Sequence, residues 1–551
     1  MKAEPRVDWQ RIRYTLDPGG FQTMRLTKQP IHRFVVVFLL LFGLSSSPLA
    51  IRGQSKDFRL TDEVQKAVNG ISPASMREHL KFIASDELQG RNTPSTGLDR
   101  AADYIAAQFK KAGLEAPGDD GYFQTANWVQ PVRNPRSFSL SIRSGGETVS
   151  AEPGQVSFLF PGALSLRDIP VVKIDFSNTA AYTELKPSDI EGKAVITELP
   201  DLQRAERTRR GELMQAQRTF LSGLQSMKAA LVLSIDRNGV AGTGFSPGRL
   251  IDPDNRPQPG AQTPALPVVQ LIGPSGAKLF DALPMGATSA VLSINVDAST
   301  EAPVKLRNVI GVLRGSDPAL RETYVLVTAH YDHLGVNPNV EGPDKIFNGA
   351  NDDGSGTVSV IEIATALSRL KPRPRRSIVF MTVFGEEKGL LGSRYYGRHP
   401  VFPIEKTVAD VNLEQIGRTD DSEGPQVGTC AMTGFDFSDV GEIFKAAGDL
   451  VGIKVFKHPT KSDTYFGRSD NQALADQGVP AHTLSVAYEY PDYHKVGDHW
   501  DKVDYDNMAK VDRMVAVGLL MIANSSVEPR WDEANPKTAR YVKAWHDHHQ
   551  K

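Results

Sequence analysis

Two histidines and three carboxylates carry the chemistry that this sequence suggests. Each stands in a short motif: His330-Tyr-Asp332, Asn351-Asp-Asp-Gly-Ser-Gly356, Gly385-Glu-Glu387, Asn412-Leu-Glu414 or Tyr493-His494. Hydrolytic zinc centres use nitrogen and oxygen ligands and keep a position open for water. The five candidates exceed the needs of one catalytic zinc and suit two ions that share a carboxylate. The sequence therefore predicts two Zn²⁺ per chain, held by His330, Asp352, Glu387, Glu414 and His494.

Such ligands need a scaffold that brings distant segments together. Apolar runs predict strands, and helical patterns lie between them; the strands are 308–313, 324–328, 377–384, 408–413 and 481–486, and the helices 355–370, 390–396 and 437–447. This alternation predicts an α/β fold with a mostly parallel sheet sandwiched by helices. Ligands bind at the carboxyl ends of strands in such sheets. Because His330, Glu386, Glu387 and Glu414 follow strand ends, we expect them to meet at one edge.

Two residues next to these motifs have less direct assignments. Asp332 stands two residues after His330, where its carboxylate could accept the other ring N–H of that imidazole. For His333, a place beside the metal ligands and a place on the surface are equally compatible with the sequence.

The ordered motifs resemble those of peptidase family M28, whose members are co-catalytic zinc exopeptidases. The resemblance covers about 306–525, and Arg468-Ser-Asp470 and Gly478-Val-Pro480 also fit it. It implies that Asp352 bridges two zinc ions. It further implies that His330 and Glu414 complete one zinc site, and that Glu387 and His494 complete the other.

The same resemblance implies the catalytic roles. Glu386 would be the general base, and Tyr493 would donate a hydrogen bond to the developing oxyanion. Many aminopeptidases of the family carry Asp at the position of Glu414, and the additional methylene group still leaves a carboxylate ligand there.

Changes in composition along the chain predict five parts. These are a signal peptide or leader at 1–50, an N-terminal helical part at 56–126 that packs on the peptidase domain, an inserted mixed α/β domain at 127–305, the zinc peptidase domain at 306–525 and a C-terminal tail at 526–551. Within the insertion, Ile190-Glu-Gly-Lys-Ala-Val-Ile196 and the segment 227–234 resemble a protease-associated domain.

One motif in the insertion imitates a serine hydrolase. Gly244-Phe-Ser-Pro-Gly248 matches the G-x-S-x-G pattern, in which the residue after the serine donates its backbone N–H to the oxyanion. Pro247 occupies that position and has no N–H. Ser246 is therefore interpreted as a loop serine.

Charge and the N-terminal segment limit the partners and the location. A net charge of −2 gives no electrostatic reason to expect nucleic acid, and the single cysteine, Cys430, excludes an intramolecular disulfide. An apolar run at 34–44 follows basic residues and precedes small ones, which is typical of a secretory signal. We therefore expect a secreted or periplasmic protein without a stable membrane span, unless the leader stays uncleaved as an anchor. The sequence does not determine the oligomeric state.

These observations predict a secreted di-zinc aminopeptidase that hydrolyses N-terminal residues from peptides. A carboxypeptidase or dipeptidase of the same fold is the main alternative, with Arg394, Arg418 or Arg468 as a clamp for the substrate carboxylate. A single-zinc enzyme similar to glutaminyl cyclases and a non-catalytic relative are further alternatives. The complete set of five ligands and Glu386 argues against both.

Overall fold

The computed structural model describes residues 58–178, 182–200, 209–237, 239, 248–256, 266–338 and 340–549. The described residues all lie in one compact unit, Ile51–Lys551. The predicted leader at 1–50 and the loop serine Ser246 lie outside the described residues. No helix among the described residues is both long and apolar enough to span a membrane.

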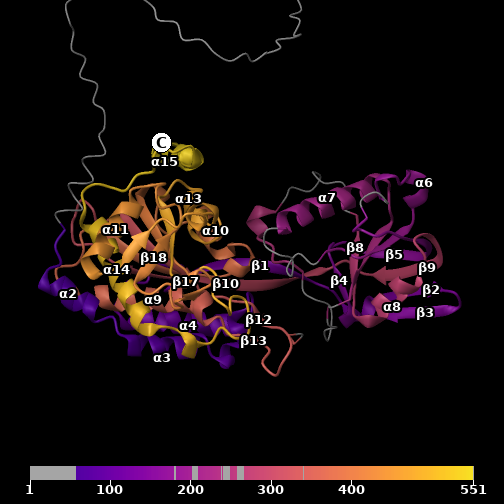
Figure 1. Cartoon of the computed structure of the whole chain (residues 1–551), viewed down its shortest axis with the longest axis horizontal. Helices are drawn as coiled ribbons and strands as arrows, with labels where there is room; N and C mark the ends of the chain where they lie inside the picture. The colour runs from indigo at the N-terminus through magenta and orange to yellow at the C-terminus, as the bar shows by residue number, and fades with distance from the viewer. Residues whose placement is uncertain are drawn as a thin grey trace, which may run out of the picture. The chain divides into compact units, whose positions relative to one another are not determined.

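An eight-stranded sheet runs through the part of the chain that carries the predicted ligands (Figure 1). In spatial order, its strands are β1 (Phe123–Val132), β10 (Thr300–Leu313), β14 (Ser377–Val383), β11 (Tyr324–His330), β15 (Thr407–Leu413), β20 (Ala481–Ser485), β18 (Thr429–Met432) and β19 (Lys454–Phe456). The four central strands, β14, β11, β15 and β20, are parallel.

The sheet is mixed, which corrects the expectation of a mostly parallel one. β10 pairs antiparallel with both β1 and β14, and β18 pairs antiparallel with β20. The alternation of strands and helices encodes only the parallel centre, because each parallel connection needs a crossover helix. The antiparallel edge arises from β1, which comes from the N-terminal part of the chain and joins the sheet beside β10.

Helices cover both faces of this sheet and explain why its strands are apolar throughout. α2 (Asp62–Asn69), α3 (Pro73–Ile83), α4 (Thr96–Lys111), α9 (Gly356–Leu367), α11 (Val440–Val451) and α14 (Tyr505–Asn524) contribute to one core cluster. α10 (Leu391–Arg398), α13 (Asn471–Ala475) and α15 (Ala539–His549) contribute to a second cluster. Along β11, Val325 and Val327 belong to the first cluster and Leu326 to the second. This alternation places β11 between two apolar layers.

Helix α15 lies in the segment predicted to be a C-terminal tail. Its Tyr541 is buried and stacks on Trp531, with 4.9 Å between ring centroids, and it also contacts the ring of Phe466 at 5.4 Å. Aromatic burial of this kind ties the end of the chain to the second core cluster. The segment therefore packs on the domain over its described residues.

The inserted segment forms a second eight-stranded sheet with its own apolar clusters. In spatial order its strands are β3 (Glu147–Ala151), β2 (Ser139–Ser144), β9 (Gly286–Val296), β5 (Leu164–Lys173), β6 (Ala194–Thr197), β7 (Leu231–Asp236), β8 (Val268–Ile272) and β4 (Val156–Phe158). The helices of this segment include α6 (Pro187–Ile190), α7 (Arg210–Ser226) and α8 (Pro274–Ala282). The predicted boundaries at 127 and 305 fall inside β1 and β10, so one antiparallel ribbon leads into and out of the insertion.

Short elements complete the structure around the sheet edges. They are β12 (Gly335–Val336) paired with β13 (Ile346–Phe347), β16 (Asp420–Asp421) paired with β17 (Gly424–Pro425), and helix α12 (Lys461–Thr464).

The close approach of α4 to the preceding turn gives a stability prediction. A Cβ at Gly97 would lie 1.8 Å from the carbonyl oxygen of Leu88, so Gly97→Ala should cost about 1–3 kcal/mol of unfolding free energy through overpacking. Gly223→Ala in α7 is the control, because no described atom beyond the adjacent backbone of its own helix lies within 4 Å of the added Cβ, and alanine favours helix by about 1 kcal/mol. Urea unfolding curves would test both variants, and a Gly97→Ala protein as stable as the parent would contradict the packing.

Candidate metal centre

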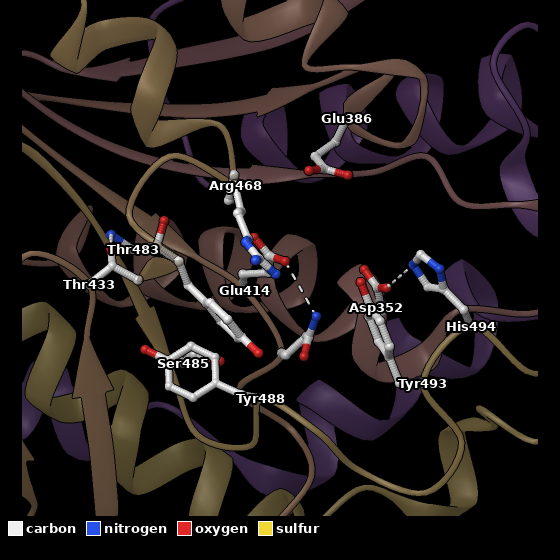
Figure 2. A pocket seen from close by; sticks show the side chains of 13 residues that line it. Asp352, Glu386, Glu414, Thr433, Arg468, Thr483, Ser485, Tyr488, Tyr493 and His494 are labelled. Atoms are coloured by element: carbon white, nitrogen blue, oxygen red, sulfur yellow. Dashed lines mark hydrogen bonds and ion pairs between the residues drawn. The ribbon is translucent and has the colours of Figure 1, made fainter. Parts of the chain in front are cut away.

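The predicted ligands follow the carboxyl ends of neighbouring parallel strands. His330 is the last residue of β11, and Glu414 directly follows β15. Glu386 and Glu387 lie in a single turn of helix, Glu386–Lys388, that begins three residues after β14. Asp352 lies in the segment Ala350–Ser355 before α9, where its own backbone is extended, with φ −107° and ψ 101°. His494 comes from the loop after β20, and Figure 2 shows Asp352, Glu386, Glu414 and His494 around one space.

A first ligand group consists of His330, Asp352 and Glu414. One potential ligand atom of each residue lies within 4.8 Å of the others. Nε2 of His330 is 3.3 Å from Oδ1 of Asp352. His330 and Asp352 are buried, while the Glu414 side chain is partly accessible. This arrangement suits one ion with an open position toward the pocket.

A second ligand group uses the other oxygen of Asp352. Oδ2 of Asp352 is 3.0 Å from Nε2 of His494, and the same nitrogen is 3.2 Å from Oε1 of Glu387. His333 also faces this group, with its Nδ1 2.9 Å from Oε1 of Glu387. Because His333 is fully buried, the alternative that it lies on the surface is wrong. Asp352 thus offers one carboxylate oxygen to each group.

Several atoms of the two groups are buried without a hydrogen-bond partner among the described residues. They include Nε2 of His330, Oε1 of Glu387 and Oε2 of Glu414. An unpaired buried polar atom costs free energy, and a cation at this place would remove that cost. Imidazole nitrogens together with carboxylate oxygens form a donor set that suits zinc. The residues therefore fit zinc ions.

The proton affinities of the side chains reflect burial and mutual charge. Burial raises the pKa of Glu414 to about 7 and holds the pKa of Glu386 well above its usual range. Burial also disfavours the charged form of Glu387, but the neighbouring imidazoles of His333 and His494 outweigh it and lower the pKa to about 2. Against burial, Asp352 and Glu387 raise the pKa of His494 to about 10. The centre thus concentrates negative charge that attracts cations.

Asp332 connects the first ligand group to Glu386. Its Oδ1 lies 3.6 Å from Nδ1 of His330 and accepts the backbone N–H of Glu386 at 3.0 Å. Its Oδ2 accepts the hydroxyl of Thr93 at 3.1 Å. The Asp332 carboxylate thus lies beside a ring nitrogen of His330, as the sequence suggested. It also fixes the position of Glu386 through the backbone.

Two further carboxylates hold the loops that carry the ligands. Asp353 accepts backbone N–H groups from His330 at 3.3 Å and from Gln415 at 3.2 Å. Asp498 accepts the backbone N–H groups of Asn351 and Asp352 at 3.0–3.1 Å. Asp498 therefore fixes the loop that carries the shared Asp352 carboxylate. Asp353 fixes the chain at the ends of β11 and β15.

Arg91 ties the N-terminal part of the chain to the same loops. Its guanidinium is fully buried and donates to main-chain carbonyls of Tyr331 at 2.8 Å, Asn348 at 2.7 Å, Gly349 at 3.0 Å and Ile83. Burial lowers its pKa to about 10. Its φ of 48° lies in a region that residues other than glycine rarely adopt, so the surrounding contacts hold it there.

Tyr493 lies next to the second ligand group and lines the pocket. Its ring stacks on His494, with 4.0 Å between centroids and 23° between ring planes. Residues that line the pocket on other sides include Thr433, Arg468, Thr483, Ser485 and Tyr488 (Figure 2). The pocket walls are mostly polar and adjoin both ligand groups.

Sequence reasoning missed Arg91, Thr93 and Asp498. The helices around 80 and 105 looked like packing elements, and nothing in the polar stretch between them distinguishes a buried arginine from an exposed one. Only a weak indication in the sequence placed Asp498 at the site: it follows the predicted ligand His494 by four residues within the same loop.

Comparison with known proteins identifies a related sequence family. Residues 308–518 match the family described as peptidase family M28. A probable leucine aminopeptidase 2 of Aspergillus oryzae is 26% identical over 464 residues, which cover 78% of this chain and 80% of that protein. A probable zinc metalloprotease of Leptosphaeria maculans is 42% identical over 93 residues, 17% of this chain and 20% of that protein.

A solved structure shares the fold. The aminopeptidase from Aneurinibacillus sp. strain AM-1 superposes with a TM-score of 0.52 at 18% identity, covering 85% of this chain and 97% of that chain. This coverage extends beyond residues 308–518.

Replacing Arg91 should destabilise the protein through lost hydrogen bonds. Arg91→Met leaves four buried carbonyls without their donor, so the unfolding free energy should fall by at least about 3 kcal/mol. Arg91→Lys keeps a charge and fewer donors and should lose less. Arg100→Met removes an exposed guanidinium paired with Glu87 and should change stability by less than about 1 kcal/mol. Equal stability of the Arg91→Met and Arg100→Met proteins in urea would contradict this role.

Proposed function

Residues 308–518 form a peptidase family M28 domain, that of a zinc-dependent metallopeptidase, and we propose that this protein is a di-zinc aminopeptidase. It would hydrolyse N-terminal residues from peptides. The observation that carries the proposal is the pair of ligand groups that share Asp352, with Glu386 next to them.

Within this proposal, the two groups would hold one zinc ion each. His330, Asp352 and Glu414 would hold the first, and Asp352, Glu387 and His494 the second. Zinc held by these residues would supply Lewis-acid chemistry: it would lower the pKa of a bound water molecule and polarise the carbonyl of the scissile peptide bond. The two groups together contain three carboxylates, those of Asp352, Glu387 and Glu414. Their negative charge can balance two divalent ions better than one, which supports two zinc ions per chain.

Glu386 would move the proton. Its Oε2 lies 4.0 Å from Nε2 of His330, and its carboxyl is largely shielded from solvent. Burial, partly offset by the neighbouring His330, holds its pKa well above the usual range, which suits a group that takes a proton from water and gives it to a leaving amine. Asp332 would orient Glu386 by accepting its backbone N–H.

The similarity to the probable leucine aminopeptidase supports cleavage at the amino end. A substrate ammonium group would be attracted by the carboxylates that line the pocket, which are Asp352, Glu386 and Glu414. Tyr493 lines the same pocket and would donate its hydroxyl hydrogen to the carbonyl oxygen as negative charge develops there.

One observation favours cleavage at the carboxy end as a second candidate. Arg468 lines the pocket and has no carboxylate within ion-pair distance among the described residues, so it could bind a substrate carboxylate. Arg418, by contrast, is paired with Asp420 and Asp492. A single-zinc or non-catalytic protein would have no need for two ligand groups and Glu386 together.

The parts of the chain outside the metal centre have proposed roles of their own. We propose that the insertion, 127–305, is a protease-associated-like domain that shapes access to the pocket. The order of basic, apolar and small residues in the segment 25–50 supports export of the protein, by a signal that is removed or kept as an anchor.

Substrates with and without a free amine distinguish the two exopeptidase candidates. The zinc-loaded protein should cleave a leucyl anilide and leave its N-acetylated form intact, because the acetyl group removes the ammonium charge. Zinc content, measured on the same sample, should be two per chain. Cleavage of neither anilide by a protein with two zinc ions would favour the carboxy-end candidate, and a protein that binds no zinc would contradict the mechanism.

The proposed base gives a second test. Glu386→Gln should lower kcat by at least about 10²-fold, the usual contribution of a general base, while zinc content stays at two per chain. Glu442→Gln, at an exposed position on α11, is the matched control and should leave both quantities unchanged. Full turnover by a zinc-loaded Glu386→Gln protein would exclude Glu386 as the base.

A further inference from the structure

We propose that the pocket beside the metal centre selects substrates whose N-terminal residue has a short, uncharged side chain that both donates and accepts hydrogen bonds, best of all the carboxamide of asparagine. Gln415 and Tyr488, which line this pocket, would be the specificity-determining residues. Both residues lie outside the two ligand groups. This inference rests on the proposed aminopeptidase function and names the substrate class of that same site.

The wall of the pocket is unusually polar for a site that would bind an apolar side chain. The described residues that line it include no valine, leucine, isoleucine, methionine or phenylalanine. Thr433, Ser485 and Tyr488 lie across the space from Asp352 and His494 (Figure 2). Hydroxyl groups that are removed from water without a hydrogen-bond partner cost free energy. A polar substrate side chain is therefore better matched to this wall than an apolar one.

Two hydroxyl groups of the wall already have partners within the protein. The hydroxyl of Thr433 accepts the backbone N–H of Thr483 at 3.0 Å, and the hydroxyl of Thr483 donates to Oδ1 of Asn471 at 2.8 Å. These hydrogen bonds hold both threonines in place. Recognition of a substrate side chain therefore depends on neighbouring polar groups that lack such partners.

Gln415 presents a buried hydrogen-bond acceptor. Its Nε2 donates to Oε1 of Glu414 at 3.3 Å, and this bond orients the amide group. The amide oxygen, Oε1, is buried and has no hydrogen-bond partner among the described residues. Because an amide oxygen accepts hydrogen bonds and cannot donate them, it needs an N–H or O–H group from a ligand.

The backbone of Gln415 is held in a conformation that residues other than glycine rarely adopt. Its φ is 54°, in the left-handed region. Its carbonyl accepts the N–H groups of Val486 and Ala487 at 3.3 and 3.4 Å, and its own N–H donates to Asp353 at 3.2 Å. Backbone strain of this kind gathers at ligand-binding sites, where it fixes the direction of a side chain.

Tyr488 supplies a buried hydrogen-bond donor. Its hydroxyl oxygen is buried and has no hydrogen-bond partner among the described residues. Burial raises the pKa of Tyr488, so the hydroxyl keeps its proton. The ring meets those of Tyr465 and His458 edge to face, with 5.3 and 5.9 Å between centroids, which fixes its orientation. This O–H group therefore needs an acceptor from a ligand.

A carboxamide matches both groups at once. Its NH₂ group would donate to Oε1 of Gln415, and its carbonyl oxygen would accept the hydroxyl hydrogen of Tyr488. A carboxylate offers no hydrogen to Gln415 and is repelled by Glu414, whereas an ammonium group offers no acceptor to Tyr488.

The size of the pocket favours a short side chain. Its free volume of about 60 Å³ has room for only about four to six groups of the size of a water molecule. Asparagine fits this space, and lysine and arginine are too long for it. Leucyl substrates fit as well and would be cleaved more slowly, because they leave Gln415 and Tyr488 without partners.

Two substrates of similar shape test this inference. The value of kcat/KM is measured with the zinc-loaded full-length protein for the p-nitroanilides of asparagine and leucine, whose side chains have equal numbers of non-hydrogen atoms. We expect kcat/KM to favour asparagine by at least about 10-fold, because leucine leaves buried polar atoms unpaired.

Variants of the two specificity-determining residues should reduce this preference. In Tyr488→Phe and in Gln415→Met, the ratio of kcat/KM for asparagine to that for leucine should fall by at least about threefold, because each variant removes one hydrogen bond to the carboxamide. The ratio distinguishes recognition from a structural role, since a loss of zinc or of folded protein affects both substrates equally.

The control variant is Tyr122→Phe, whose hydroxyl donates to the carbonyl of Leu114 at 2.7 Å away from the residues that line the pocket. Its ratio should equal that of the parent protein. If Tyr488→Phe fails to fold, as judged by circular dichroism, Gln415→Met decides. A smaller preference in the parent, or an unchanged ratio in a folded variant of Gln415 or Tyr488, would overturn the inference and leave the aminopeptidase function intact. Cleavage of neither anilide by a protein with two zinc ions would instead contradict the proposed function.

Discussion

Mutual repulsion of buried carboxylates is the constraint on which the rest of this structure depends. Six carboxylates gather beyond the ends of β11, β14 and β15, namely Asp332, Asp352, Asp353, Glu386, Glu387 and Glu414. Like charges in a medium of low dielectric constant repel each other strongly, so the fold needs positive charge nearby. Arg91 supplies one fixed charge, three histidines supply charges that depend on protonation, and metal ions supply the remainder in the proposed function.

The carboxylates divide into two kinds according to what satisfies them. Asp332, Asp353 and Asp498 accept backbone N–H groups, and each of these hydrogen bonds fixes a loop at the edge of the sheet. The carboxylates of the ligand groups keep oxygens free of such bonds, as Glu387 and Glu414 show. Rigid loops and unsatisfied ligand atoms together form a preorganised cation site, which needs little rearrangement when an ion binds.

The sequence predicted the centre of the sheet and the meeting of the candidate ligands, because parallel strands end at one edge and His330, Glu387 and Glu414 follow strand ends there. It did not predict the antiparallel edge, since the pairing of β1 with β10 joins segments that local periodicity cannot relate. Arg91 was missed for a similar reason. Its role comes from carbonyls more than 200 positions away along the chain, such as those of Tyr331 and Gly349. His333 remained ambiguous until its burial was known.

The ribbon of β1 and β10 has an evolutionary consequence. Val132 pairs with Thr300 at its far end, so the whole insertion occupies the place of the turn in a β-hairpin. A short turn could close the same hairpin without changing the register of β10 against β14. The entropic cost of closing a loop rises only slowly with its length. An ancestral gene could therefore have gained or lost this domain in a single recombination event and kept its catalytic half intact.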